Sequence, residues 1–151
     1  MANDTRIQRI LVAFDGSKDS VKAIRLACSI ASRNSAKVTV VHVYSSPVIA
    51  FSAASGMPIP DYTDLEQAAK DTGKQILSRG VQLAADAGVK AEGELLEASS
   101  VVQALVEFAT KEKADLIVVG TRGMTGFRKL ILGSVSAGLV SHSPCTVLVA
   151  R

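Results

Sequence analysis

The chain has 151 residues, a formal net charge of +3 and no tryptophan. Apolar residues make up 48% and charged residues 21%, an ordinary globular composition that excludes intrinsic disorder. No apolar run reaches the roughly 20 residues that a membrane-spanning helix needs, and the length favours one domain over residues 1–151. The polar N-terminus and the two cysteines, too few for a disulfide scaffold, predict a reducing, cytoplasmic location.

The positive charge is concentrated near the C-terminus. Residues 1–119 hold thirteen basic and fourteen acidic residues, whereas residues 120–151 hold four basic residues and no acidic one. Arg122, Arg128 and Lys129 fall close together in this segment. Such a cluster attracts a compact anion such as a polyphosphate, although a solvated basic loop explains it equally well. A nucleic-acid binder would spread basic residues along a face and add aromatic residues for stacking, so that class is disfavoured.

The first part of the chain predicts a strand, a helix and a second strand, followed by a long loop. Residues 7–14 form a largely apolar run that is typical of a buried strand. Ser17 is a suitable N-cap for the next segment, in which apolar residues recur at helical spacing. Lys37–Val43 predicts a second strand. Residues 44–61 combine prolines, a glycine and serines, and predict a loop longer than most connections.

The rest of the chain continues the alternation of helices and strands. In chain order it predicts a helix at 62–87, a strand at 89–96, a helix capped by Ser99 or Ser100, a strand at 115–119, a helix at 133–141 and a strand at 146–150. This order predicts an α/β fold in which a five-stranded parallel sheet carries helices on both faces. The last strand is apolar and expected at an edge, where exposed strands tend to pair, so we expect a homodimer through strand 146–150.

Two predicted strands end in residues with useful chemistry. Strand 7–14 runs into Asp15, and strand 115–119 ends at Gly120. In doubly wound sheets, ligands bind beyond the carboxyl ends of the strands at which the winding changes direction. If these two strands are neighbours, Asp15 and Gly120 face one crevice. Asp15 could there hold ribose hydroxyls or a divalent cation such as Mg²⁺.

The segment that follows Gly120 suits an anion. Gly120 and Gly123 allow the backbone to approach a ligand without an intervening Cβ. Gly133 and Ser134 open a helix whose first amides have no partners within the helix, and the hydroxyls of Ser134 and Ser136 can add hydrogen bonds. Glycines are also common at strand ends and helix starts for structural reasons. The patterns GxxxxGK[ST] and GxGxxG are absent, which counts against a P-loop NTPase and a dinucleotide dehydrogenase.

Several segments together resemble a known family, the universal stress protein family. The resemblance is carried by RILVAFDGS (9–17), VVHV (40–43), ADLIVVGTRG (114–123), LGSVS (132–136) and PCTVLV (144–149), so it spans essentially the whole chain. The nucleotide-binding branch of the family carries the motif G-x2-G-x9-G-[S/T]. Gly120, Gly123, Gly133 and Ser134 match it.

The resemblance implies a flavodoxin-like, Rossmann-like strand order 3-2-1-4-5 with ATP, or AMP or ADP, in the crevice. It places Ala13 and Phe14 beside adenine and ribose, the backbone of Val43 at adenine, and Asp15 at the ribose and Mg²⁺ side. The remaining cofactor-binding residues would surround ribose and phosphates: Gly120, Arg122, Gly123, Gly133, Ser134, Val135 and Ser136. The resemblance also implies that strand 146–150 pairs antiparallel with the same strand of a second copy.

These observations predict an ATP-binding regulatory module of the stress response. No residue is assigned as catalytic, because none clearly positions a general base for water. We therefore expect slow ATP hydrolysis at most, and family analogy adds autophosphorylation on Ser134 or Ser136. Two alternatives stay open, namely an enzyme that transfers phosphate or adenylate from the same pocket and a nucleotide-free scaffold of the same fold. The intact Gly133-Ser134 pair counts against the scaffold.

Overall fold

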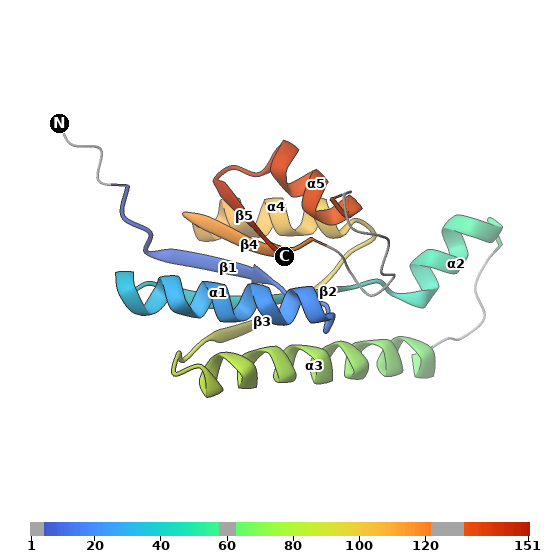
Figure 1. The fold of residues 1–151 in the computed structure, drawn as a ribbon. Helices are drawn as coiled ribbons and strands as arrows, with labels where there is room; N and C mark the ends of the chain where they lie inside the picture. Colours follow the sequence, from blue (N-terminus) through green and yellow to red (C-terminus); the bar gives the residue numbers. More distant parts are fainter. Residues whose placement is uncertain (1–4, 58–62, 122–131) are drawn as a thin grey trace.

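A five-stranded sheet in the order β3-β2-β1-β4-β5 forms the centre of the molecule (Figure 1). The computed structural model describes residues 5–57, 63–121 and 132–151. The strands are β1 (Arg9–Ala13), β2 (Lys37–Tyr44), β3 (Glu92–Glu97), β4 (Leu116–Gly120) and β5 (Thr146–Ala150). Neighbouring strands all run parallel. The predicted α/β class and the strand order 3-2-1-4-5 are confirmed.

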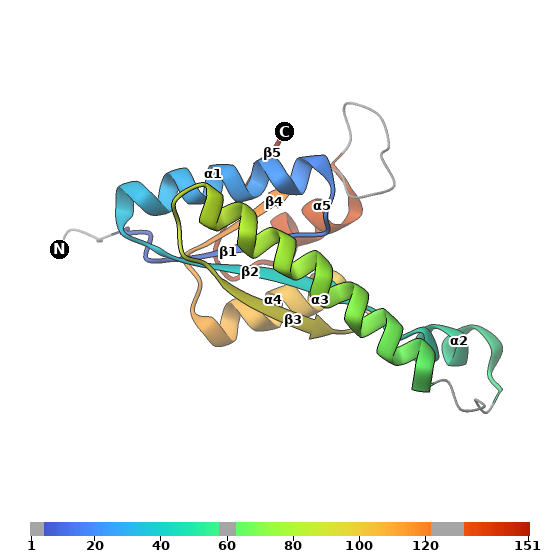
Figure 2. The same cartoon turned by 90° about the horizontal axis from the view of Figure 1, so that it is seen from below.

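Helices lie on both faces of the sheet, as predicted. The described helices are α1 (Lys18–Asn34), α2 (Pro47–Ser55), α3 (Thr63–Asp86), α4 (Val101–Glu112) and α5 (Ser134–His142). Helices α1 and α3 cover one face, and α4 and α5 cover the other (Figure 2). The two edge strands are β3 and β5, and β5 is the strand that was expected at an edge from its sequence.

Side chains along the central strand alternate between two hydrophobic cores. Ile10 and Val12 of β1 pack beneath α1 and α3, whereas Leu11 packs with α4 and α5 on the other face. None of the three is more than 3% exposed. Because both faces of the sheet are covered, the strand appears in the sequence as a continuous apolar run rather than as an alternating one.

Helix starts and strand ends follow the sequence with small shifts. Ser17 caps α1, and of the two serines predicted for α4 it is Ser100 that forms the cap. Strand β3 begins at Glu92, later than the predicted residue 89. Phe14 lies just beyond the end of β1.

Residues 47–55 correct the prediction of a loop over 44–61, because they form helix α2. Pro47 stands at the start of this helix, where the fixed φ of proline suits the first turn. Gly56 ends the helix with a φ of +65°. The helix lies beyond the end of the sheet, beside the start of α3 (Figures 1 and 2), and its sequence has no amphipathic pattern.

The first part of α3 extends past the sheet together with α2. The buried residues of α3 begin at Gly73, well after its start. Phe51, Met57 and Leu65 are 43%, 65% and 52% exposed in this projecting region. Among the helices of the described residues, none combines the length and the apolar character needed to cross a membrane.

Candidate functional site

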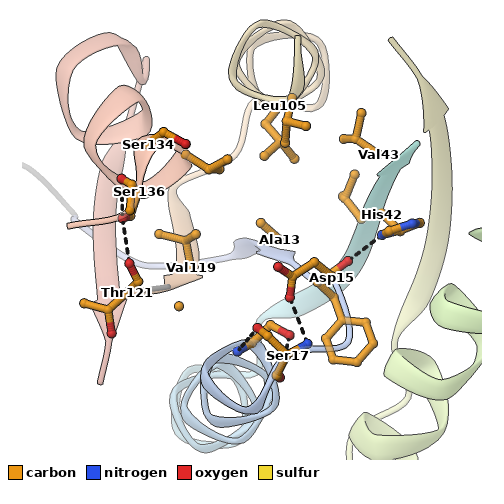
Figure 3. Close-up of a pocket in the computed structure, with 17 residues that line it drawn as sticks. Ala13, Asp15, Ser17, His42, Val43, Leu105, Val119, Thr121, Ser134 and Ser136 are labelled. Atoms are coloured by element: carbon orange, nitrogen blue, oxygen red, sulfur yellow. Dashed lines mark hydrogen bonds between the residues drawn. The ribbon is translucent and has the colours of Figure 1, made fainter. Parts of the chain in front are cut away.

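A cavity of about 240 Å³ opens at the carboxyl ends of β1, β2 and β4, beside α4 and α5 (Figure 3). At this point the strand order changes direction, because β2 and β3 lie on one side of β1, whereas β4 and β5 lie on the other side. Nine predicted site residues line the cavity: Ala13, Phe14, Asp15, Val43, Gly120, Gly133, Ser134, Val135 and Ser136. Arg122 and Gly123, the other two, lie outside the described residues, as do Arg128 and Lys129.

One side of the cavity is apolar. It is formed by residues at the ends of the strands and on the facing side of α4: Ala13, Val41, Val43, Val101, Leu105 and Val119. In Figure 3, Leu105 of α4 and Val43 of β2 lie across the cavity from Asp15. A wall of aliphatic side chains between two secondary-structure elements suits a flat, largely apolar ring.

The other side of the cavity is polar and joins the starts of two helices. Its residues lie at the beginning of α1, at the end of β4 and at the beginning of α5: Asp15, Ser17, Ser20, Thr121, Gly133, Ser134 and Ser136. A ligand that fills the cavity therefore meets an apolar wall at one end and hydroxyls and backbone amides at the other.

Asp15 is held by the turn that connects β1 to α1. The backbone N–H of Ser17 donates to Asp15 Oδ1 at 2.9 Å. Between them, Gly16 has a φ of +84°, a left-handed conformation that favours glycine. From α3, the Arg79 guanidinium donates to the Gly16 carbonyl at 3.1 Å. These contacts fix one carboxylate oxygen of Asp15 at the edge of the cavity.

Asp15 could contribute to a Mg²⁺ site, but it would be one ligand of several. Within the described parts of the chain, no group of three or more His, Cys, Asp or Glu side chains is placed to hold a metal ion. A Mg²⁺ beside Asp15 would take its other ligands from phosphate oxygens and water, as is usual for this ion at nucleotide sites. The residues present fit a metal carried in by a polyphosphate.

The starts of α1 and α5 differ in how their backbone amides are satisfied. In α1, Ser17 Oγ accepts from the Ser20 N–H at 3.2 Å. In α5, the N-cap is Gly133, which has no side chain to cap the first turn. Its own N–H donates to the Thr121 carbonyl at 2.7 Å. Among the described residues, no side chain caps the amides that follow Gly133, so these amides can receive an anion, which the helix dipole also favours there.

The two serines of α5 have different surroundings. Ser136 is 1% exposed, and its hydroxyl lies 3.0 Å from the Gly133 carbonyl and 3.3 Å from the Thr121 carbonyl. Ser134 is exposed at the start of the helix and lines the cavity. A ligand in the cavity can therefore reach the Ser134 hydroxyl more readily than that of Ser136, which is used within the fold.

The absence of a side chain at Gly120 allows the first turn of α1 to pack against the end of β4. A Cβ built on Gly120 would lie 2.7 Å from the backbone carbonyl carbon of Asp19. From the sequence, the missing Cβ was expected to admit a ligand, but in the structure the first turn of α1 occupies that space. Gly120 still lines the cavity through its other atoms.

Two residues that line the cavity, Phe14 and His42, have buried side chains that pack within the fold. The Phe14 ring packs beneath α3, where a Cβ on Gly80 would lie 2.7 Å from it. His42 is 9% exposed, and its Nδ1 lies 2.8 Å from the Phe14 carbonyl, as expected for a hydrogen-bonded core histidine.

Burial, and then the charge of Glu97, raises the pKa of Tyr44. Burial also raises the pKa of the Cys28 thiol, which fits its role as a small core residue.

The sequence analysis missed part of the lining. Ser17 was assigned only as a helix cap, and Thr121 was not assigned at all. Val101 and Leu105 lie in the helix that was predicted after Ser99 or Ser100, and their spacing carries no sign that the apolar face of this helix continues past the sheet into a cavity. The one available signal was Ser17, which directly follows the Asp15-Gly16 turn.

The fold and the cavity define a class, the doubly wound α/β proteins that hold a ligand where the strand order changes direction. Within that class, the family model described as the universal stress protein family matches residues 6–151. The chain belongs to the universal stress protein family, as its motifs predicted.

Relatives and solved structures agree with this family. A universal stress protein of Methanocaldococcus jannaschii is 34% identical over 145 residues, which cover 95% of this chain and 82% of the relative. The universal stress protein UspA of Lactobacillus plantarum has the same fold, with a TM-score of 0.78, 24% identity, and coverage of 97% of this chain and 99% of the other. A universal stress protein in complex with cAMP gives a TM-score of 0.69 at 28% identity, with coverage of 97% and 98%.

Proposed function

We propose that this protein binds an adenine nucleotide in the cavity at β1, β2 and β4 and acts as a regulatory module of the stress response. The observation that carries the proposal is the division of the cavity. An apolar wall on α4 and the strand ends stands across from Asp15 and the start of α5, where the N-cap Gly133 has no capping side chain. An adenine nucleotide needs the same three surroundings in the same order: apolar side chains for its base, a carboxylate for its ribose and backbone amides for its phosphates.

Each part of the nucleotide has a chemically suitable surface. Adenine fits between Val43, Leu105 and the other aliphatic side chains of the wall, where the backbone of β2 can satisfy its polar edge. The ribose hydroxyls fit Asp15. The phosphates fit the amides that begin α5 and the Ser134 hydroxyl. ATP, with Mg²⁺ between its phosphates and Asp15, is the ligand we expect.

The family supports this assignment. The 28% identical universal stress protein with the same fold was solved in complex with cAMP, an adenine nucleotide. In this chain, Gly120, Gly133 and Ser134 of the branch motif line the cavity. These two observations favour the nucleotide-binding branch over a nucleotide-free scaffold.

We expect slow turnover of ATP at most. Within the described part of the cavity, Asp15 Oδ1 already accepts a hydrogen bond from Ser17, and His42 Nδ1 contacts the Phe14 carbonyl. These contacts assign Asp15 to the turn and the ribose side and His42 to the core, so we assign neither as the general base for an attacking water. Sustained release of phosphate or AMP at roughly 1 s⁻¹ or faster, the usual range of enzymes, would instead favour a phosphate- or adenylate-transferring enzyme.

The variant Asp15→Ala tests the ribose side of the site. A hydrogen bond to a charged group contributes about 1.5–3 kcal/mol, so we expect ATP affinity to fall roughly 10- to 100-fold. The measurement is calorimetric titration with ATP, with and without Mg²⁺. The matched control is Asp86→Ala, which removes an exposed carboxylate at the far end of α3. Equal affinities for the two variants would show that the nucleotide does not use Asp15.

A further inference from the structure

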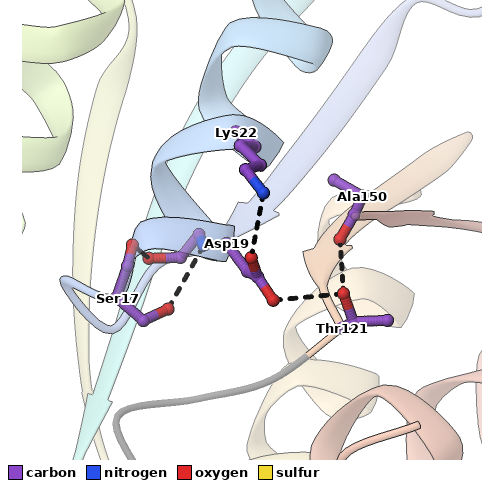
Figure 4. A network of polar contacts seen from close by, with 6 residues as sticks. Ser17, Asp19, Lys22, Thr121 and Ala150 are labelled. Carbon is purple, nitrogen blue, oxygen red and sulfur yellow. Dashed lines mark hydrogen bonds and ion pairs between the residues drawn. The ribbon is translucent and has the colours of Figure 1, made fainter. Parts of the chain in front are cut away.

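A buried carboxylate lies next to the cavity and has no part in the assignment above. Asp19, in the first turn of α1, is 6% exposed. From the sequence it is an acidic residue that suits a helix start, where an aspartate is usually exposed to solvent. In the structure it points toward the ends of β4 and β5 (Figure 4).

Asp19 and the end of β5 share one hydroxyl. Thr121 Oγ1 lies 3.1 Å from Asp19 Oδ2 and 3.0 Å from the Ala150 carbonyl, so its single proton serves two acceptors. The Thr121 N–H also donates to the Ala150 carbonyl at 2.9 Å. Lys22 forms an outer ion pair with Asp19 Oδ1 at 3.4 Å. Thr121 is thus held from α1 on one side and from β5 on the other.

The carbonyl of Thr121 holds the start of α5. It accepts from the Gly133 N–H at 2.7 Å, and the Ser136 hydroxyl lies 3.3 Å away. The residue before the segment 122–132 is therefore hydrogen-bonded directly to the residue after it. Thr121 therefore helps to position the first amides of α5.

The distance between α1 and β4 leaves little freedom in this arrangement. A Cβ on Gly120 would lie within 2.7–2.9 Å of Asp19 and the Ser20 nitrogen, so the first turn of α1 lies directly on the end of β4. Closely packed elements transmit displacements rather than absorb them. A loss of the contact between Asp19 and Thr121 would therefore displace the start of α5.

We propose that Asp19 is a positioning residue for the phosphate side of the nucleotide site. Its carboxylate holds the Thr121 hydroxyl, and Thr121 holds the start of α5 in the orientation that receives the phosphates. This inference rests on the proposed binding of an adenine nucleotide. It adds a residue that touches no nucleotide and acts through its neighbour.

Because Asp19 is charged, a positioning role can be distinguished from a simple electrostatic effect on ATP binding. A negative charge beside a phosphate site repels the ligand, so its removal alone would strengthen ATP binding. A positioning role predicts the opposite sign. The direction of the change in affinity distinguishes the two.

The test compares five variants in ATP titration calorimetry. We expect Asp19→Ala and Thr121→Val each to weaken ATP binding about tenfold, the effect of losing one buried hydrogen bond. Asp19→Asn and Thr121→Ser keep an acceptor and a hydroxyl, and should recover most of that loss. Lys22→Ala removes the outer ion pair and should stay within about twofold of the parent.

A second readout needs no nucleotide. In the nucleotide-free protein, hydrogen exchange of the Gly133 amide should be faster by about tenfold in Asp19→Ala and Thr121→Val than in the parent, since its acceptor is displaced. If the parent fails to bind ATP, the proposed function fails, and this readout alone decides the positioning role. If Asp19→Ala does not fold, Thr121→Val carries the same test. Unchanged or tighter ATP binding together with unchanged Gly133 exchange would overturn the inference.

Discussion

At the scale of single residues, the turn between β1 and α1 sets the geometry of the site. Gly16 adopts a φ of +84°, and its neighbours Asp15 and Ser17 both line the cavity. The Arg79 guanidinium holds the Gly16 carbonyl from α3. The position of the Asp15 carboxylate therefore depends on a backbone conformation that residues with a Cβ rarely adopt.

The pair Gly16→Ala and Gly88→Ala tests this dependence. Gly88 has a φ of +81° and lies just beyond the end of α3, so both substitutions introduce the same kind of backbone strain. Each should lower the free energy of unfolding by about 1–2 kcal/mol, measured by urea denaturation. Only Gly16→Ala should also weaken ATP binding. Equal affinities for both variants would show that the turn does not position the nucleotide.

Some residue roles could be predicted from the sequence and others could not. Asp15 and Gly133 were found because a strand end and a helix start are local features with known chemistry. Asp19 and Thr121 were missed because their contact joins residues 102 positions apart, and each residue also fits its local position without that contact.

At the scale of elements, the sheet was predictable and α2 was not. The central strands are covered on both faces, so their sequences are continuously apolar and easily recognised. Helix α2 lies beyond the sheet and has no hydrophobic periodicity to reveal it, while Pro47 and Gly56 resemble loop residues. The part of the cavity wall that α4 forms could not be predicted either, because the same apolar face of this helix packs in the core and lines the cavity.

The pair Phe51→Ser and Ile24→Ala tests how little the projecting region contributes to stability. Phe51 is 43% exposed, and its replacement should change the free energy of unfolding by less than about 0.5 kcal/mol. Ile24 of α1 is 0% exposed, and its truncation should cost about 2–5 kcal/mol. Both values come from urea denaturation. A large loss for Phe51→Ser would mean that α2 packs as part of the core.

At the scale of the whole molecule, the open edge at β5 is the place where we propose that two copies pair. Strand β5 is the last in the sheet, and its residues Val147, Leu148 and Val149 are only partly buried in the single chain. Val140 of the neighbouring α5 is 55% exposed. Apolar edges of this kind tend to be covered by a partner strand.

Light scattering during size-exclusion chromatography tests the dimer. At micromolar concentration we expect a mass of about twice the 15.8 kDa of the chain. The same run with ATP added shows whether the nucleotide affects assembly. A mass near that of one chain under both conditions would contradict pairing through β5.

If phosphates bind at the start of α5, a side chain at Gly133 should exclude them, and the variant Gly133→Val introduces one. Gly133 has φ and ψ of −59° and 161°, which a branched residue adopts without strain, so the fold should be kept. ATP titration calorimetry should show tight uptake by the parent and a loss of at least about 100-fold in the variant, with an unchanged melting temperature. Equal ATP affinity in the two proteins would place the nucleotide elsewhere, away from the start of α5.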